Sequence, residues 1–153
     1  MIMDKLNTEL RQQAVDFGLC DKWRGGWKSD KSQQELIDMW KKGIDFAIIH
    51  DYPSIDFIKA NFDRKLLNRN LIFVDEPIEI KNAPSGIYVI NGECSGTLWF
   101  NSWAAATVYV RHNSNVRIIA DDFAKVFVRL YDDASADVIE LDGAVIKVYD
   151  RRE

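Results

Sequence analysis

The chain has 153 residues, of which 47% are hydrophobic and 29% charged, and its formal net charge is −4 at pH 7. This length and composition suit one compact unit or two small subdomains with a buried core, and they argue against global disorder. The acidic balance argues against nucleic acid as a partner, because nucleic-acid surfaces normally carry a basic patch or stripe.

The N-terminal residues Met1–Lys5 lack the basic segment and apolar stretch of a signal peptide, and no run of about 18 apolar residues predicts a membrane span. We therefore expect no membrane partner and a cytoplasmic protein, or a virion component if the chain is a phage structural protein. The two cysteines, Cys20 and Cys94, are far apart without CxxC spacing. We interpret both as reduced, buried thiols, and a single disulfide between them is the alternative.

Residues 1–70 have helical periodicity. Apolar residues at helical spacing predict a first helix over 7–17, and Gly18 suits the left-handed position after it. The segment 21–28, with its paired glycines, then breaks the periodicity.

A second helix is predicted from Ser32, because Ser32 and Glu35 form a capping box before a run of apolar residues at three- and four-residue steps. We expect this helix to continue to the Tyr52–Pro53 step, where proline disfavours helical geometry in the preceding residue. Ser54 then offers an N-cap for a third helix that extends to Phe62.

Residues 71–153 change to short strands with alternating apolar side chains, separated by turns rich in Asp and Asn. The turns recur roughly every ten residues, which calls for a repeat architecture. The predicted strands are 71–74, 87–90, 97–100, 107–110, 116–120, 125–131, 136–141 and 145–149.

The fold class is therefore α+β, with a helical subdomain (1–70) followed by a short β-solenoid (71–153). An antiparallel β-sandwich or meander is the alternative. The solenoid is favoured because most turns lack the Asn-Gly and Gly-x pairs typical of tight hairpins. Small residues just before the strands (Ala106, Ala124, Ala136, Ala144) are expected where rungs pack closely, and the charged segment 150–153 suits an exposed end.

The stretch from Ala106 to Asp150, rich in Ala-x-Val and Tyr-Asp steps, resembles short β-repeat segments of uncharacterised bacterial, prophage and phage proteins. The segments 43–47 and 51–58 look like the helical region that accompanies such repeats. The resemblance implies the architecture and a phage or mobile-element setting, and it brings no activity or catalytic motif.

Candidate nucleophile–base pairs are Cys94 with His112 and Cys20 with His50, but no nucleophile motif surrounds either cysteine. The two histidines lack zinc-ligand spacing, and no phosphate-binding glycine motif is present. No cofactor or metal is therefore expected. Two weaker alternatives are calcium binding and carbohydrate binding by aspartates, and both require the turns to stack so that the aspartates form one column. Asp121–Asp122 and Asp132–Asp133 would bind calcium, or Asp121, Asp132 and Asp142 would bind carbohydrate beside Trp99, Trp103 or Tyr131.

Four tryptophans, Trp23, Trp27, Trp99 and Trp103, fall in irregular or boundary segments, and we take them as interface candidates because Trp is enriched at binding hot spots. A basic stripe along the solenoid, formed by Arg24 and Lys28 with Arg111, Arg117, Arg129 and Lys147, is a weaker alternative that would bind nucleic acid, because charges on outward strand positions usually serve solubility. The sequence thus favours a non-enzymatic interaction or structural protein with a protein partner or self-association. The alternatives are an inhibitor or regulator of a host nucleic-acid enzyme and a carbohydrate-active solenoid protein.

Overall fold

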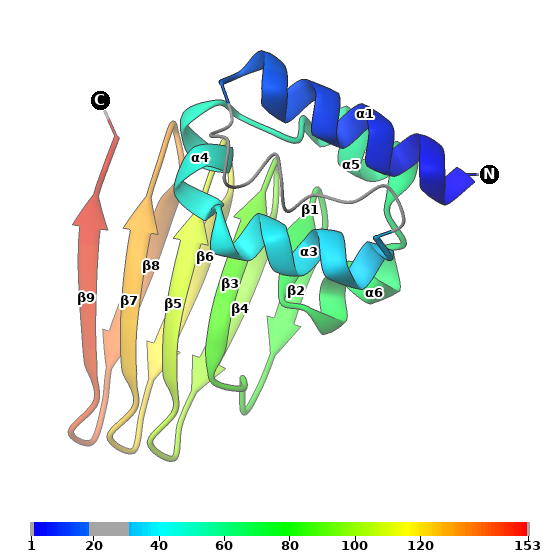
Figure 1. Ribbon diagram of the computed structural model, residues 1–153. Coiled ribbons are helices and arrows are strands. Elements are labelled where there is room, and N and C mark those ends of the chain that lie inside the picture. Colours follow the sequence, from blue (N-terminus) through cyan, green and yellow to red (C-terminus); the bar gives the residue numbers. More distant parts are fainter. Residues whose placement is uncertain (1, 19–30, 153) are drawn as a thin grey trace. The chain divides into compact units, whose positions relative to one another are not determined.

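The computed structural model describes residues 2–18 and 31–152, and the chain divides into two compact units, residues 1–66 and 67–153. Five helices precede the strands in the described residues (Figure 1). None of them is long and apolar enough to span a membrane. The helices are α1 (Ile2–Asp16), α3 (Gln33–Lys42), α4 (Ile44–Ile49), α5 (Ile55–Asn61) and α6 (Arg64–Arg69).

The first helix begins before the predicted start and ends close to the predicted end. Leu6, Leu10 and Ala14 are buried on one face of α1, as their helical spacing predicts. Gly18 has a φ of +92°, the left-handed conformation expected after a helix. The Tyr52 hydroxyl donates a 2.6 Å hydrogen bond to the Leu10 carbonyl, which ties α1 to the segment after α4.

The capping box at Ser32 is confirmed, since Ser32 Oγ accepts from the Glu35 amide and Glu35 Oε1 accepts from the Ser32 amide. The prediction of one helix from Ser32 to Tyr52 is wrong, because the helix is interrupted at Gly43 between α3 and α4. Gly43 leaves helical geometry while its amide still donates to the Met39 carbonyl. Glycine makes such a break easy because it has no Cβ to restrict the backbone. The third helix, capped by Ser54, is confirmed as α5.

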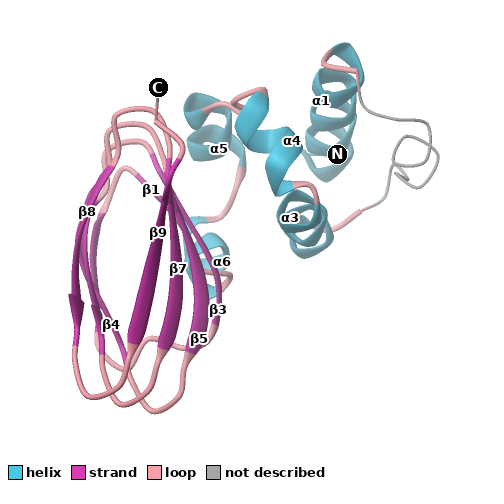
Figure 2. Cartoon of the chain, turned by 90° about the vertical axis from the view of Figure 1, so that its left-hand side faces the viewer, coloured by secondary structure: helices cyan, strands magenta, loops and turns pink. Residues whose placement is uncertain are grey.

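The second unit is a β-solenoid, which confirms the favoured architecture and excludes the antiparallel alternative. Its strands form two sheets with only parallel pairing, in the orders β1-β3-β5-β7-β9 and β2-β4-β6-β8. Figure 2 shows the strands of the two sheets facing each other across the core. The strands are β1 (Ile72–Val74), β2 (Pro77–Ile80), β3 (Gly86–Asn91), β4 (Ser95–Phe100), β5 (Ala105–Val110), β6 (Asn115–Ala120), β7 (Lys125–Leu130), β8 (Ser135–Glu140) and β9 (Val145–Asp150).

One rung of the solenoid is twenty residues long and contains two strands and two turns. Ala106 is the register partner of Val126, and Val116 is the partner of Ala136, twenty residues on in each case. The ten-residue period of the sequence is therefore half a rung. Consecutive strands belong to opposite sheets, and consecutive turns belong to opposite ends of the rung.

Alternate side chains of each strand point into the core and form columns along the solenoid. Val108, Ile118 and Val128 are completely buried in these columns. The small residues that fill the ends of the rungs are Ala104, Ser114, Ala124, Ala134 and Ala144, all buried immediately before a strand. Of the four alanines predicted for this role, Ala124 and Ala144 are in place. Ala106 and Ala136 lie instead within β5 and β8.

Strand β2 was missed by the sequence analysis, which treated Pro77 as a boundary. Proline is tolerated there because it is the first residue of the strand. Glu76 just before it holds the turn, as its Oε2 accepts from the Val74 amide and from the Asn68 side chain. The helix α6 was missed as well, since its six residues are too few to show a period.

Candidate interaction surface

The turns at one end of the rungs, residues 101–104, 121–124 and 141–144, stack on one another and form what we call the aromatic corner. Their backbones are linked, because the Trp103 amide donates to the Asp122 carbonyl and the Phe123 amide to the Asp142 carbonyl. The second and third residues of each turn have positive φ, and the third residues are Trp103, Phe123 and Gly143.

Two large aromatic residues therefore hold a backbone conformation that suits glycine. Trp103 has a φ of +64° and Phe123 a φ of +63°, whereas the same position in the next turn is Gly143. A bulky residue with positive φ is a true outlier, and such strain costs of order 1–3 kcal/mol per residue. Local backbone energetics therefore do not explain the choice of tryptophan and phenylalanine at these positions.

The two rings stack on each other at the surface. Their centroids are 4.7 Å apart with an interplanar angle of 16°. The other side of Phe123 lies over Gly143, because a Cβ added there would be 2.5 Å from Phe123 Cε1. Trp103 is nevertheless 70% exposed and Phe123 46% exposed. The corner thus presents an exposed apolar column in which the inner ring faces are already in contact.

Carboxylates line the aromatic column. Asp122 accepts at Oδ2 from the Ser102 hydroxyl at 3.4 Å, and its own amide donates to Asp121 Oδ1 at 2.7 Å. A hydrogen bond with Asp121, together with the negative charges of Asp121 and Asp122, raises the pKa of Asp142. This corner therefore combines exposed aromatic side chains with a local negative charge.

The opposite end of the rungs has a structural role. In the turns that contain Gly92, His112 and Asp132, side chains accept hydrogen bonds from backbone amides of neighbouring rungs. His112 Nδ1 accepts from the Gly92 amide at 2.9 Å, Asp132 Oδ2 accepts from the His112 amide at 3.1 Å, and Asp75 Oδ1 accepts from the Glu93 amide at 2.7 Å. These bonds satisfy amides at the turns and hold successive rungs together.

The proposed pairing of Cys94 with His112 has no support in these contacts. The Cys94 thiol is buried and donates to the Asn91 carbonyl at 3.2 Å, while the His112 ring accepts from the Gly92 amide. Burial raises the pKa of the Cys94 thiol, which disfavours the reactive thiolate. His50, the base of the other pair, lies between the Phe17 and Phe46 rings, and Cys20 falls outside the described residues.

The stacked aspartate column, which the sequence offered only as a weaker alternative, does not form. Asp121 and Asp142 do meet at the aromatic corner, but Asp132 lies at the opposite end of the rung, beside His112. For the same reason the pairs Asp121–Asp122 and Asp132–Asp133 do not face each other. In the described part of the chain, no three His, Cys, Asp or Glu side chains gather in a way that suits a metal ion.

The predicted basic stripe is also wrong, because its members within the described residues, which exclude Arg24 and Lys28, lie on different surfaces. Arg111 is buried and donates to Asn91 Oδ1 at 3.0 Å. Arg117 is on β6 of the four-stranded sheet, whereas Arg129 and Lys147 are on β7 and β9 of the five-stranded sheet. Arg129 lies between the rings of Tyr109 and Tyr149, with its guanidinium 5.7 Å and 5.6 Å from their centroids.

Of the four tryptophans proposed as interface residues, the two that the structure describes, Trp99 and Trp103, lie on different parts of the solenoid surface. Trp23 and Trp27 lie outside the described residues. Trp99 is half-buried on β4, in the same outward column as Ile119 and Ile139. Only Trp103 is at the aromatic corner. Phe123, its stacking partner, was not predicted, although it stands twenty residues after Trp103 and a twenty-residue period would have identified it.

Comparisons of the chain with protein-family models, with curated proteins and with solved structures find no match. A proposal about function therefore rests on the chemistry of the aromatic corner.

Proposed function

We propose that this chain is a non-enzymatic interaction protein whose solenoid presents the aromatic corner to a protein partner. The observation that carries this proposal is the pair Trp103 and Phe123, held in a left-handed backbone conformation with their rings stacked and exposed. Strained conformations persist where the surrounding structure enforces them, and they concentrate at functional sites. Exposed Trp is also the residue type most typical of binding hot spots.

The expected partner has an apolar contact surface with Lys or Arg around it. The apolar part would cover the edges of the Trp103 and Phe123 rings. The basic part would face Asp121, Asp122 and Asp142, which lie so close together that a hydrogen bond with Asp121 and the negative charges of Asp121 and Asp122 raise the pKa of Asp142. Charge complementarity of this kind favours fast association and selects among partners.

The carbohydrate alternative has weaker support at this corner. Phe123 offers no open ring face to a sugar, because one face stacks on Trp103 and the other lies over Gly143, so any stacking would be limited to the outer face of Trp103. The third residue of the proposed acidic column, Asp132, is at the other end of the rung.

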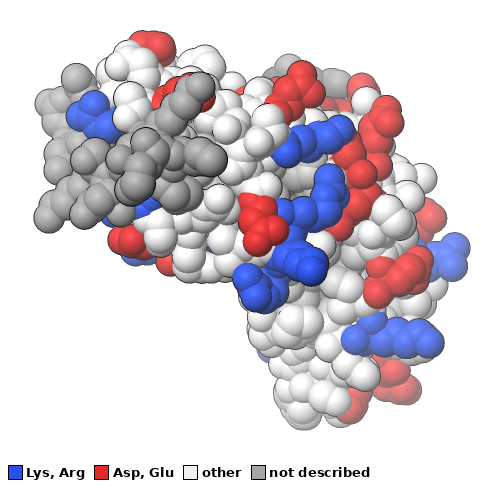
Figure 3. Space-filling view, turned by 90° about the vertical axis from the view of Figure 1, so that its right-hand side faces the viewer, with Lys and Arg blue, Asp and Glu red and all other residues white. Residues whose placement is uncertain are grey.

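Acidic mimicry of nucleic acid, the remaining alternative, requires one strongly negative face. Figure 3 shows Lys and Arg side chains interspersed with Asp and Glu over the face turned to the viewer, so this face does not favour it. The phage or mobile-element setting indicated by the sequence resemblance stays part of the proposal. Genes for phage structural or regulatory proteins beside this one would support it.

The test is a pull-down with the tagged chain from a lysate of the source organism, with quantitative mass spectrometry and light scattering. The informative variants are Trp103→Gly and Phe123→Gly, because glycine removes the ring and also relieves the positive φ. The matched control is Phe127→Ala, which removes an aromatic ring of similar exposure (40%) from the outer face of β7.

One stoichiometric partner that is lost with Trp103→Gly and Phe123→Gly, but retained with Phe127→Ala, would support the proposal. If both glycine variants keep the full set of bound proteins, or if the native chain captures none, the proposal is wrong. Thermal denaturation of each variant shows whether a lost partner reflects a lost fold.

A further inference from the structure

In the described part of the chain, the rung formed by β8 and β9, which we call the last rung, leaves two strand edges open. Strand β8 is the last strand of the four-stranded sheet and β9 the last of the five-stranded sheet. The amides of Ser135 and Leu141 donate back to β6 and its flanking turn, and those of Val145 and Arg151 donate back to β7 and its flanking turn. Because backbone amides alternate in direction along a strand, those of Val138, Glu140, Ile146 and Val148 face away from the solenoid.

The same rung leaves core side chains open. Val138 is 38% exposed and Val148 43% exposed, whereas the residues before them in the same columns, Ile118 and Val128, are completely buried. This end of the solenoid thus combines backbone groups that bond to no further strand with exposed inward-facing valines. Such an edge is a template for pairing with another strand.

The two open strands are complementary to each other. They run in opposite directions, because the turn at residues 141–144 reverses the chain (Figure 1). A two-fold axis parallel to the strands would place β8 of one copy beside β9 of a second copy, antiparallel, and would create the same pairing twice. A dimer of this kind is closed and leaves neither strand of the last rung unpaired.

We propose that a second copy of this chain binds the last rung, with each β8 pairing antiparallel to the β9 of the other copy. The register that fits places Val138 opposite Ile146 and Ala136 opposite Val148 on the inner side. On the outer side, Ile139 lies opposite Val145, and Asp137 lies opposite Lys147. In this register the paired amides face each other and these three apolar pairs are matched, while Tyr149 lies opposite Ser135.

The charges select this register. Asp137 and Lys147 are exposed, and in the described part of the chain neither has an ion-pair partner. A shift by two residues places Lys147 opposite Ile139 or Ser135, and a shift by one places inner side chains against outer ones. An alternative dimer would pair β8 with β8 and β9 with β9. Two registers give this dimer its maximal overlap: one places Asp137 opposite Asp137, and the other places Lys147 opposite Lys147. Like charges directly opposite are destabilising.

The dimer is expected to be weak. Six-residue strands about 20 Å long, in sheets about 10 Å apart with an outer layer of side chains, give a footprint of about 400 Å² per copy. A total of about 800 Å² is below the usual range for stable complexes, so dissociation constants of about 10–100 µM are expected.

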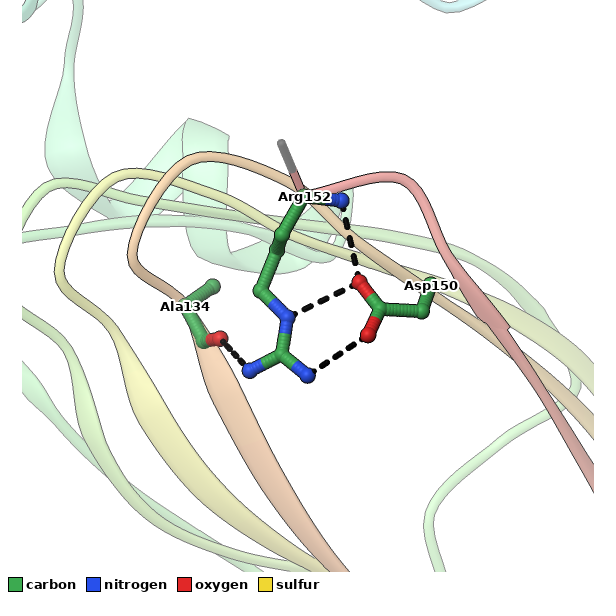
Figure 4. A network of polar contacts seen from close by, with 3 residues as sticks. All are labelled: Ala134, Asp150 and Arg152. Carbon is green, nitrogen blue, oxygen red and sulfur yellow. Dashed lines mark hydrogen bonds and ion pairs between the residues drawn. The ribbon is translucent and has the colours of Figure 1, made fainter.

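Side chains of the last rung compete with the second copy. Glu140 Oε2 accepts from the outward-facing Ile146 amide at 2.9 Å, and the Arg152 guanidinium donates to the Ala134 carbonyl at 3.1 Å while it pairs with Asp150 (Figure 4). Dimerisation requires Glu140 to release the Ile146 amide. Removal of the Glu140 carboxylate therefore favours the dimer.

The test is sedimentation velocity over a concentration series from about 1 to 500 µM, a range set by the expected affinity. We expect Asp137→Lys and Lys147→Asp each to weaken dimerisation at least tenfold, and the double variant Asp137→Lys/Lys147→Asp to restore it to within about threefold. Glu140→Ala should strengthen it severalfold. The matched control is Thr107→Asp, which places a charge two rungs earlier in the column of Lys147 and should change nothing.

A native chain that stays monomeric at 500 µM would overturn the proposal, as would dimerisation that the charge swap does not rescue. Both swapped residues are exposed, but Asp137→Lys also places a lysine beside Arg117, its register partner in β6. Circular dichroism and thermal denaturation therefore verify that each variant is folded. This proposal does not depend on the aromatic corner. Loss of the protein partner with Trp103→Gly should leave dimerisation intact.

Discussion

Val128 and Val148 are register partners in the same inward column of the solenoid, yet Val128 is completely buried and Val148 is 43% exposed. The two residues differ in one respect, which is the presence of a following rung. Val128 is covered by β9, whereas no strand of the described chain follows β9 in its sheet. The solenoid therefore completes its core only where another rung is stacked on it.

This pair gives a direct test of the column. We expect Val128→Ala to lower the free energy of unfolding by about 2–3 kcal/mol, because it removes buried methyl groups and leaves a cavity. Val148→Ala, the same change one rung later, should cost less than about 1 kcal/mol in dilute, monomeric protein. Chemical denaturation at low protein concentration measures both, and equal losses would contradict the open-end description.

Gly96 is expected to be the glycine least tolerant of substitution. It pairs with Ile78 in the neighbouring strand, and a Cβ at this position would lie 1.7 Å from the Ile78 carbonyl oxygen. Gly96→Ala should therefore cost more than about 3 kcal/mol, since backbone atoms have to move. Gly86→Ala is the matched control, because its Cβ would meet only the movable Leu71 Cδ1 at 3.0 Å. Similar thermal stabilities of the two variants would refute this prediction.

The carboxylates of the aromatic corner predict a dependence of stability on pH. The pKa of Asp142 is raised by its hydrogen bond to Asp121 and by the negative charges of Asp121 and Asp122, so the folded state binds this proton more tightly than the unfolded state. The stabilisation that comes from proton binding by Asp142 is fully present below the unfolded-state pKa of about 3.9. It is lost as pH rises through the raised pKa of the folded state.

Asp142→Asn should therefore raise the melting temperature at pH 7, because it removes one of the mutually repelling charges, and Asn tolerates the left-handed backbone found here. The gain should shrink towards zero at pH 3. Asp133→Asn, at an exposed position in the turn at the opposite end of the rungs, serves as the control and should show no such gain. Calorimetry at both pH values would reject the prediction if the gain at pH 3 equals that at pH 7.

Cys94 should react with thiol reagents only after unfolding. Its side chain is buried, burial raises its pKa, and its thiol donates to the Asn91 carbonyl. Brief treatment with iodoacetamide, followed by peptide mass spectrometry, should leave Cys94 unmodified in native protein and modified in urea. Rapid modification in native protein would indicate that this part of the solenoid opens readily.

Much of the secondary structure follows from local sequence. The capping box at Ser32 and Glu35 and the N-cap at Ser54 act over three residues, so the start of each helix is visible without a structure. The alternation in strands such as β7 reflects one buried face, which has a period of two. The break at Gly43 was not visible because a single glycine within an apolar helical pattern is often tolerated.

The sequence by itself determined a helical segment followed by strands and turns at ten-residue spacing, and it favoured a solenoid over an antiparallel sandwich. Only the tertiary structure decided that one rung contains two of these repeats. Asp121 and Asp142 therefore share an end of the rung, and Asp132 lies at the other. The stacking of Trp103 on Phe123 depends on the same closure. The physical reason is that a local repeat fixes where the chain turns, whereas backbone pairing between rungs fixes which turns come to lie on one another.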